Sequence, residues 1–314
     1  MSLNKQFAAL GLRLNAERQF MAVLSRLARL ARRAWVEGNL VRQAEFSVGG
    51  RKIVYSPIRH QSRLLDQLVD QGIWSYEPEL SRFILDNPLG YDHFVDGGAH
   101  VALFSIIAEC SKKYRSVVAI EASPATAAYI RGIKQRNGLS FALHECALGE
   151  SAGRTTFEIP DTGYVMPSHS ALTISDLYQE QSKKTVEIAV RPLQDFVETG
   201  RTLIKLDCEG AEEAILKAAL PGLRARNDVD FVIEIMINDT NKDAVFALMR
   251  EAGYAAYLMT NAGLVREDRA LTLPLQGDIP KPGKSRTGWR NHLFSKAPPA
   301  DIARVSHRLY GYFP

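Results

Sequence analysis

From Tyr91 onward, segments typical of β-strands alternate with segments of helical periodicity. The expected strands cover residues 93–96, 116–121, 141–147, 203–207, 230–236 and 254–259. Helical patterns lie between most of them, at 101–114, 124–135, 209–219 and 242–252. Such alternation predicts an α/β fold with a mostly parallel sheet covered on both faces, and ligands at the carboxyl ends of its strands. We expect the apolar segment 291–295 to form a last strand at the edge of this sheet.

The rest of the chain is arranged around this α/β domain, which we place at 91–296 with an insertion at about 150–200. Residues 1–45 form a basic amphipathic helical extension, and 46–90 form an adapter that contains a hairpin around Gly49–Gly50 and short helices. Residues 297–314 are a tail. These boundaries follow changes in periodicity and the positions of glycine and proline.

Positive charge is concentrated near the N-terminus. The whole chain carries a net charge of +4, which does not call for a nucleic-acid partner, whereas residues 1–43 contain one Lys and seven Arg against two Glu. The apolar residues within 4–37 recur at helical spacing, with most arginines on other faces. This segment therefore fits a helix docked on the body or on a second subunit of a homo-oligomer, or a helix resting on an anionic membrane surface.

The three cysteines, Cys110, Cys146 and Cys208, are widely spaced and set among largely apolar residues. An odd number with this spacing predicts buried free thiols in a reducing compartment. No run of about 18 apolar residues is present, so no spanning helix is expected and we predict a cytoplasmic protein. No spacing specifies zinc or an EF-hand, so we predict no metal site, with Mg²⁺ as the open alternative.

Acidic residues end the first two strands. The first continues as FVDGGAHVALFS, in which Asp96 precedes two glycines and an apolar helix. The dinucleotide fingerprint G-x-G-x-x-G fails here, because Ala99 and Ala102 occupy its later glycine positions. Glu121 ends the second strand, where a carboxylate can accept both hydroxyls of a ribose. A single acid at such a place also serves to cap the following helix.

The fourth strand runs into a cluster of acids in LIKLDCEGAE, which contains Asp207, Glu209 and Glu212. Carboxylates at three strand ends suit a ligand that has a ribose and a positive charge but no pyrophosphate. S-adenosylmethionine has these properties, because its adenosine carries a sulfonium and an amino-acid tail. We therefore expect S-adenosyl-L-methionine as the cofactor.

The series FVDGGAHVALFS, AIEASP, Asn137, CALG, LIKLDCEGAE and FVIEI resembles the FkbM family of S-adenosylmethionine-dependent methyltransferases. The resemblance spans about 74–236, including WSYEP before the first strand, and NHLFS resembles the family's terminal strand. It implies a class I, Rossmann-like methyltransferase fold with seven strands, the last antiparallel, and O-methyl transfer to a sugar, glycan or small secondary metabolite. The chain departs from the family's D-x-G-A-N-x-G at His100 and Ala102, which places a tighter loop near the methionine moiety.

These arguments select two sets of site residues. We expect the cofactor to be bound by Asp96, Gly98, Ala99, His100, Glu121, Ala147 and Asp207. Methyl transfer from a sulfonium to a hydroxyl also requires removal of a proton. The candidates for that role are Asp207, Glu209, Glu234 and His169. Each has a simpler alternative, since Glu209 can complement a helix dipole, Glu234 can form an ion pair, and His169 can be a solvated loop residue.

Two other functions compete with methyl transfer. A non-catalytic binding or scaffold protein would keep the fold with an altered first loop, and His100 and Ala102 are the residues that favour it. A nicotinamide oxidoreductase would need the glycine fingerprint that the chain lacks.

Overall fold

The structure is a computed structural model. It describes residues 44–55, 63–160, 183–208, 210–236, 242–260, 263–267 and 289–310. The predicted N-terminal helix within 4–37 lies outside these residues, and so does the polar part of the insertion around 161–182. The proposed domain boundaries stay a prediction.

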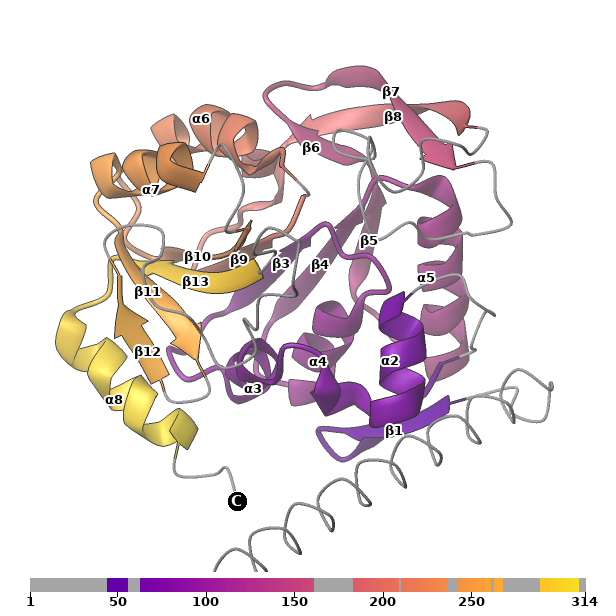
Figure 1. Ribbon diagram of the computed structural model, residues 1–314, viewed down its shortest axis with the longest axis horizontal. Helices are drawn as coiled ribbons and strands as arrows, with labels where there is room; N and C mark the ends of the chain where they lie inside the picture. The colour runs from indigo at the N-terminus through magenta and orange to yellow at the C-terminus, as the bar shows by residue number, and fades with distance from the viewer. Residues whose placement is uncertain are drawn as a thin grey trace, which may run out of the picture.

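An eight-stranded sheet forms the centre of the fold (Figure 1). Its strands, in spatial order, are β12 (Gly263–Arg266), β11 (Ala255–Thr260), β13 (Trp289–Ser295), β10 (Val229–Met236), β9 (Thr202–Leu206), β3 (His93–Gly97), β4 (Ser116–Glu121) and β5 (Ala142–Glu145). The five strands from β10 to β5 are parallel, and β13 is antiparallel to both of its neighbours. The predicted antiparallel last strand is therefore confirmed, and the short β12 is added to the expected seven.

The prediction that the strand at 291–295 lies at the sheet edge is wrong. β13 lies between β10 and β11, with Asn291 opposite Glu234 and Leu293 opposite Tyr257. Successive residues of a strand point to opposite faces, and the adjacent Leu293 and Phe294 are 0% and 1% exposed. A strand that is apolar toward both faces needs cover on both, which an interior position provides.

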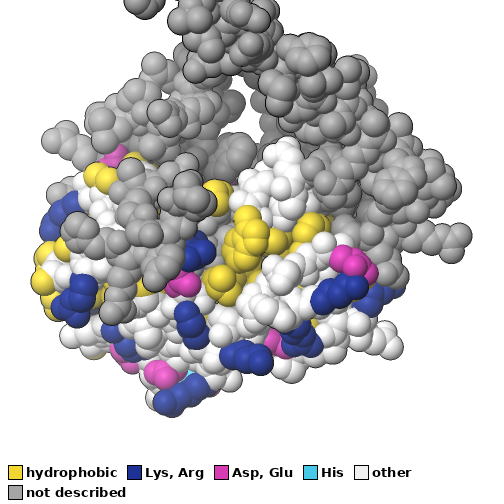
Figure 2. All heavy atoms as spheres, turned by 90° about the horizontal axis from the view of Figure 1, so that it is seen from below, with side chains coloured by type: hydrophobic (Ala, Val, Ile, Leu, Met, Phe, Trp, Pro, Cys, Tyr) yellow, Lys and Arg dark blue, Asp and Glu magenta, His cyan; other side chains and the backbone are white. Residues whose placement is uncertain are grey.

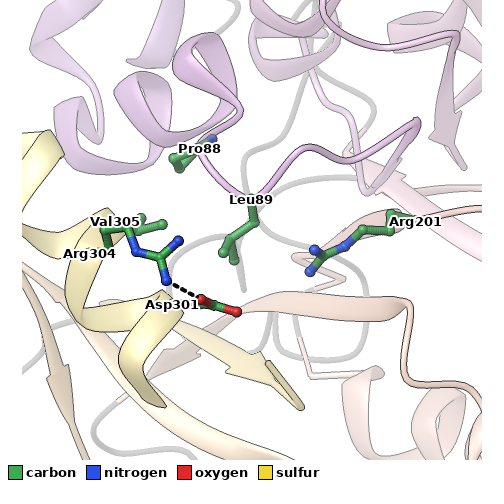
Figure 3. Close-up of a pocket in the computed structure, with 6 residues that line it drawn as sticks. All are labelled: Pro88, Leu89, Arg201, Asp301, Arg304 and Val305. Carbon is green, nitrogen blue, oxygen red and sulfur yellow. Dashed lines mark hydrogen bonds and ion pairs between the residues drawn. The ribbon is translucent and has the colours of Figure 1, made fainter. Parts of the chain in front are cut away.

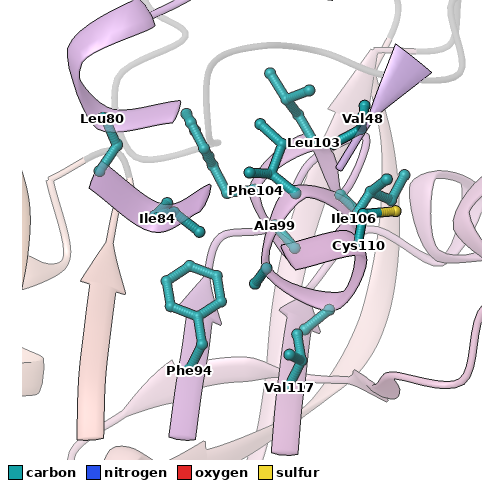
Figure 4. Close-up of a cluster of buried hydrophobic side chains, with 14 of the residues drawn as sticks. Val48, Leu80, Ile84, Phe94, Ala99, Leu103, Phe104, Ile106, Cys110 and Val117 are labelled. Carbon is teal, nitrogen blue, oxygen red and sulfur yellow. The ribbon is translucent and has the colours of Figure 1, made fainter. Parts of the chain in front are cut away.

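Helices on the two faces of the sheet enclose two hydrophobic cores. The helices of the first core are α2 (Arg63–Gln71), α3 (Pro78–Asp86), α4 (Leu103–Ser111) and α5 (Pro124–Asn137). Those of the second core are α6 (Glu212–Leu223) and α7 (Lys242–Glu251). The C-terminal helix α8 (Pro299–Tyr310) contacts β12 and adds Ile302 and Val305 to the first core. Figure 4 shows part of the first core, where Phe94 and Val117 of the sheet lie near apolar side chains of α3 and α4.

Two small sheets accompany the central one. The predicted hairpin is confirmed as β1 (Ala44–Val48) paired with β2 (Arg51–Tyr55). In the insertion, β6 (Ala147–Gly149), β8 (Lys183–Pro192) and β7 (Gly153–Pro160) form a three-stranded sheet in that order. The strand predicted at 141–147 is thus divided, because β6 leaves the central sheet to pair with β8.

All three cysteines are free, as the sequence predicts. Cys110 and Cys146 are buried, but Cys208 is half-buried, because it follows the end of β9 at the rim of the sheet.

The side chain of Asn137 joins the β1–β2 hairpin to the α/β domain. Its Oδ1 accepts a hydrogen bond from Val54 N at 2.7 Å, and its Nδ2 donates to Val54 O at 2.8 Å and to Ile133 O at 2.9 Å. Arg51 adds a hydrogen bond to the carbonyl of Gly138 at 2.8 Å. Asn137, one of the residues that carry the family resemblance, therefore has a structural role at the end of α5.

We expect Asn137→Ala to lower the free energy of unfolding by about 1–3 kcal/mol, because it leaves the Val54 backbone groups without their partner. Chemical denaturation measures this difference. The matched control is Gln135→Ala, an exposed position on the same helix, with an expected effect within about 0.5 kcal/mol. Equal effects of the two substitutions would contradict the anchoring role.

Candidate functional site

The loop after β3 is held against the ends of β4 and β9. Gly98 N and Ala99 N donate to Ile120 O at 3.1 and 2.9 Å. Gly98 has a φ of +75°, and a Cβ there would lie 1.9 Å from the carbonyl oxygen of Asp207. Only glycine fits this approach. Gly98 and Ala99 thus lie, as predicted, at the carboxyl edge of the sheet.

His100 and Ala102 have a backbone conformation that asparagine and glycine adopt more readily than other residues do. Their φ angles are 49° and 58°, in the left-handed region. Asparagine and glycine adopt this region most readily, which explains the family pattern at these two positions. The two departures therefore do not redirect the backbone, and we assign each a strain on the order of 1 kcal/mol.

Glu121 connects the loops that follow β3 and β4. Its Oε2 accepts a hydrogen bond from His100 N at 2.8 Å, and its Oε1 accepts one from Ser123 N at 2.8 Å. Each carboxylate oxygen has a second lone pair for a ligand hydroxyl. Burial raises the pKa of Glu121 from 4.5 to about 7, although these backbone hydrogen bonds oppose the shift.

Asp96 lies beneath this loop and is fully buried, with 0% exposure. Its Oδ2 accepts hydrogen bonds from Ser105 N at 3.1 Å and Ser105 Oγ at 2.7 Å, so it caps the first turn of α4. Burial raises the pKa of Asp96, and the Lys205 ammonium opposes this shift. The structure thus gives Asp96 a capping role, and its predicted contact with the cofactor stays a prediction.

Sheet register places Lys205 beside Asp96 on adjacent strands. Lys205 is 2% exposed, and its Nζ lies 3.0 Å from Asp207 Oδ2 and 3.9 Å from Asp96 Oδ1. The ring of Phe104 covers it, with 5.1 Å between Nζ and the ring centroid. Burial alone would lower the pKa of Lys205, but the charges of Asp207, Asp96 and Glu77 raise it, so the ammonium stays charged.

Asp207 and Glu234 form a hydrogen-bonded pair of carboxyl groups at the ends of β9 and β10. Burial and the negative charges of Asp207 and Glu77 raise the pKa of Glu234 well above its ordinary value. Burial acts on Asp207 in the same direction, but Lys205 and the hydrogen bond from Glu234 leave its pKa below the ordinary value. The opposite directions of the two shifts favour the ionised form of Asp207 and the protonated form of Glu234.

Glu77 and Asn291 complete this group, and the sequence argument assigned them no site role. Glu77, at the N-cap of α3, is 8% exposed, and its Oε2 accepts a hydrogen bond from Asn291 Nδ2 at 2.8 Å. Burial raises the pKa of Glu77 to about 7, while Lys205 opposes the shift. Glu77 lies in WSYEP and Asn291 in NHLFS, two motifs that carry part of the family resemblance. Membership of these motifs was the sequence feature that could have identified the two residues.

The remaining predicted residues lie elsewhere. Ala147 is in β6, opposite Val190 of the small sheet, so its cofactor contact stays a prediction. Glu209 and His169 lie outside the described residues. The helix expected from 209 begins at Glu212, whose carboxylate accepts hydrogen bonds from Cys208 N at 2.6 Å and Gly210 N at 2.8 Å. These bonds close a turn before the helix.

A cavity of about 220 Å³ lies at the opposite end of the sheet (Figure 3). It is lined by Pro88, Leu89, Arg201, Asp301, Arg304 and Val305. Arg201 precedes the first residue of β9, whereas Asp207 follows the last. The cavity is therefore separated from the carboxylates by the length of β9.

Among the described residues, no three His, Cys, Asp or Glu side chains are placed to hold a metal ion. No helix in the same ranges is long and apolar enough to cross a bilayer. In the described part of the chain, the ammonium of Lys205 lies next to the clustered carboxyl groups.

A family model described as the methyltransferase FkbM domain matches residues 96–256, slightly more than half of the 314 residues. The chain belongs to the FkbM methyltransferase family. The match covers Asp96, Glu121, Asp207 and Glu234 but leaves Glu77 outside. Family and fold imply S-adenosylmethionine as the cofactor, and the donor set fits, because carboxylates suit both ribose hydroxyls and a sulfonium.

Three solved methyltransferase structures illustrate the similarity. The FkbM methyltransferase from Methylobacillus flagellatus KT is 16% identical, with a TM-score of 0.42. The matched part covers 74% of the present chain and 52% of the Methylobacillus chain. Precorrin-6y C5,15-methyltransferase from Geobacter metallireducens GS-15 is 12% identical with a TM-score of 0.40, covering 77% and 93%. The M. jannaschii tRNA m1G37 methyltransferase is 13% identical with a TM-score of 0.38, covering 81% and 56%.

The chain thus spans about half the length of the first of these structures. None of the curated proteins with which the chain was compared matches it.

The raised pKa of Glu121 predicts a pH-dependent stability. A carboxyl whose pKa rises from 4.5 to about 7 on folding stabilises the fold fully below pH 4.5, and this contribution is lost as the pH rises to about 7. Glu121→Gln should therefore reduce the fall in unfolding free energy across this interval by roughly 1–3 kcal/mol. Denaturant titrations at several pH values measure this. Glu150→Gln, at an exposed position, is the control. An unchanged slope in Glu121→Gln would contradict the assignment.

Proposed function

We propose that this protein is an S-adenosylmethionine-dependent O-methyltransferase that acts on a hydroxyl of a sugar, a glycan or a small secondary metabolite. The observation that carries the proposal is the Asp207–Glu234 pair beside the buried Lys205. It lies at the sheet edge where Glu121 and the glycine loop also gather. Ligands of open α/β sheets bind at this edge.

Residues already in place would hold the cofactor. Glu121 is fixed by the backbone amides of His100 and Ser123, and its remaining lone pairs would accept the ribose hydroxyls. The loop at Gly98 and Ala99 lets a ligand approach the backbone closely. Asp207 supplies negative charge for the sulfonium side. When bound, S-adenosylmethionine supplies an electrophilic methyl group.

Asp207 is the group that accepts the proton. An acceptor hydroxyl that gains a methyl group becomes strongly acidic, so a weak base is sufficient if it is positioned and ionised. The side chain of Asp207 is 20% exposed, whereas that of Lys205 behind it is 3% exposed. Protonated Glu234 donates a hydrogen bond to Asp207 and thereby stabilises the charged form of Asp207.

The described part of one face of the molecule carries charges of both signs. On the face drawn in Figure 2, Lys and Arg side chains are spread among acidic and uncharged ones and do not form one continuous patch. Nucleic-acid-binding proteins usually carry a basic stripe or patch. The role of residues 4–37, in membrane contact or in a homo-oligomer, and the cytoplasmic location stay predictions.

Calorimetry with S-adenosylmethionine tests the cofactor site. We expect wild-type protein to bind and Glu121→Ala to bind about 10- to 100-fold more weakly, because it loses charged hydrogen bonds to the ribose. Glu150→Ala, at an exposed position, should bind like the wild type. Wild-type protein that gives no heat of binding would refute the cofactor assignment.

Transfer of a radiolabelled methyl group into an extract of the source cells tests the reaction. We expect a labelled product, and a rate about 10²- to 10⁴-fold lower for Asp207→Asn, which cannot accept the proton. Glu150→Gln should keep the wild-type rate. Cofactor binding without any labelled product would instead favour the non-catalytic scaffold, for which the loop residues His100 and Ala102 are the argument.

A further inference from the structure

Two segments outside the matched region 96–256 reach the proposed reaction site. Glu77 comes from the start of α3, and Asn291 comes from β13. They are joined by the 2.8 Å hydrogen bond from Asn291 Nδ2 to Glu77 Oε2. Asn291 is also the cross-strand neighbour of Glu234. The hydrogen bond thus brings the Glu77 carboxyl toward the end of β10, where Glu234 pairs with Asp207.

Glu77 is held in an unfavourable state in two respects. Its backbone is left-handed, with φ 41° and ψ 60°, a conformation that is strained for a residue other than glycine. Its side chain is 8% exposed, and its Oε1 is buried without a hydrogen bond of standard geometry from the described residues. Strain and a buried, incompletely bonded carboxyl at the same residue are features that cluster at functional sites.

The described groups around Glu77 offset its charge only in part. The Tyr76 hydroxyl and the Asn291 amide donate to it but carry no charge. Lys205 is the nearby cation, and it is already paired with Asp207 and close to Asp96. Glu77 therefore acts on Asp207 and Glu234 as a third carboxyl group.

We propose that Glu77 is a positioning residue for methyl transfer, which keeps the proton of the carboxyl pair on Glu234 and so leaves Asp207 as the ionised acceptor. This inference rests on the proposed function. Its physical basis is that a second negative charge near Glu234 disfavours ionisation of that carboxyl. Without Glu77, Glu234 would ionise at lower pH and withdraw the hydrogen bond that stabilises Asp207.

The test is a pH titration of the Glu234 carboxyl by NMR in protein labelled with ¹³C at glutamate side chains. The signal is assigned by its loss in Glu234→Gln. Glu77→Gln removes the charge but can still accept the hydrogen bond from Asn291. We expect it to lower the titration midpoint of Glu234 by about one pH unit or more. Glu79→Gln, a half-buried position on the same helix, is the matched control and should leave the midpoint unchanged.

Tyr76→Phe gives a second, milder variant. It removes a donor that stabilises the charged form of Glu77, so the midpoint of Glu234 should move in the same direction by a smaller amount. The proposal is overturned if whichever of these two variants folds leaves the titration midpoint of Glu234 unchanged. A purely structural Glu77 would alter only the stability of the protein. Calorimetry with S-adenosylmethionine on the same samples distinguishes failure of the role proposed for Glu77 from failure of the proposed function. Lack of binding by the wild type would refute the proposed function, while the titration still decides the role of Glu77.

Discussion

The ion pair between Lys205 and Asp207 is the interaction on which the carboxyl edge of the sheet depends. An ammonium buried without a partner costs several kcal/mol, so Lys205 is stable at 2% exposure only because Asp207 and Asp96 lie within 3.0 and 3.9 Å. The same pairing keeps Asp207 ionised although it lies beside Glu234. Strand alternation fixes the arrangement, because Lys205 and Asp207 share one face while Ile204 and Leu206 pack in the core on the other.

Much of this site could be predicted from local pattern. Apolar segments with β character predicted the central strands. Because the carboxyl ends of parallel strands lie at one edge of a sheet, the acids at those ends were expected to lie close together. Glu121, Asp207 and Glu234 were found in this way. The two glycines after Asp96 marked the turn between strand and helix, and the structure places the second of them, Gly98, against Asp207.

The parts that could not be predicted depend on pairing over long distances in the chain. The position of β13 inside the sheet is set by contacts with β10 and β11, and nothing local in NHLFS specifies them. Only that position brings Asn291 to Glu77, which is 214 residues away in the chain. Capping of the next helix was an alternative already considered for Asp96, but only the structure identifies Ser105 as the residue that it contacts.

A crystal structure with S-adenosylhomocysteine would test the central claim most directly, namely that the clustered carboxylates form the cofactor site. We expect the ribose hydroxyls to bind Glu121 and the sulfur to face Asp207. A ligand bound instead in the cavity beside Arg201 and Arg304, or an Asp207 carboxylate directed away from the sulfur, would contradict it.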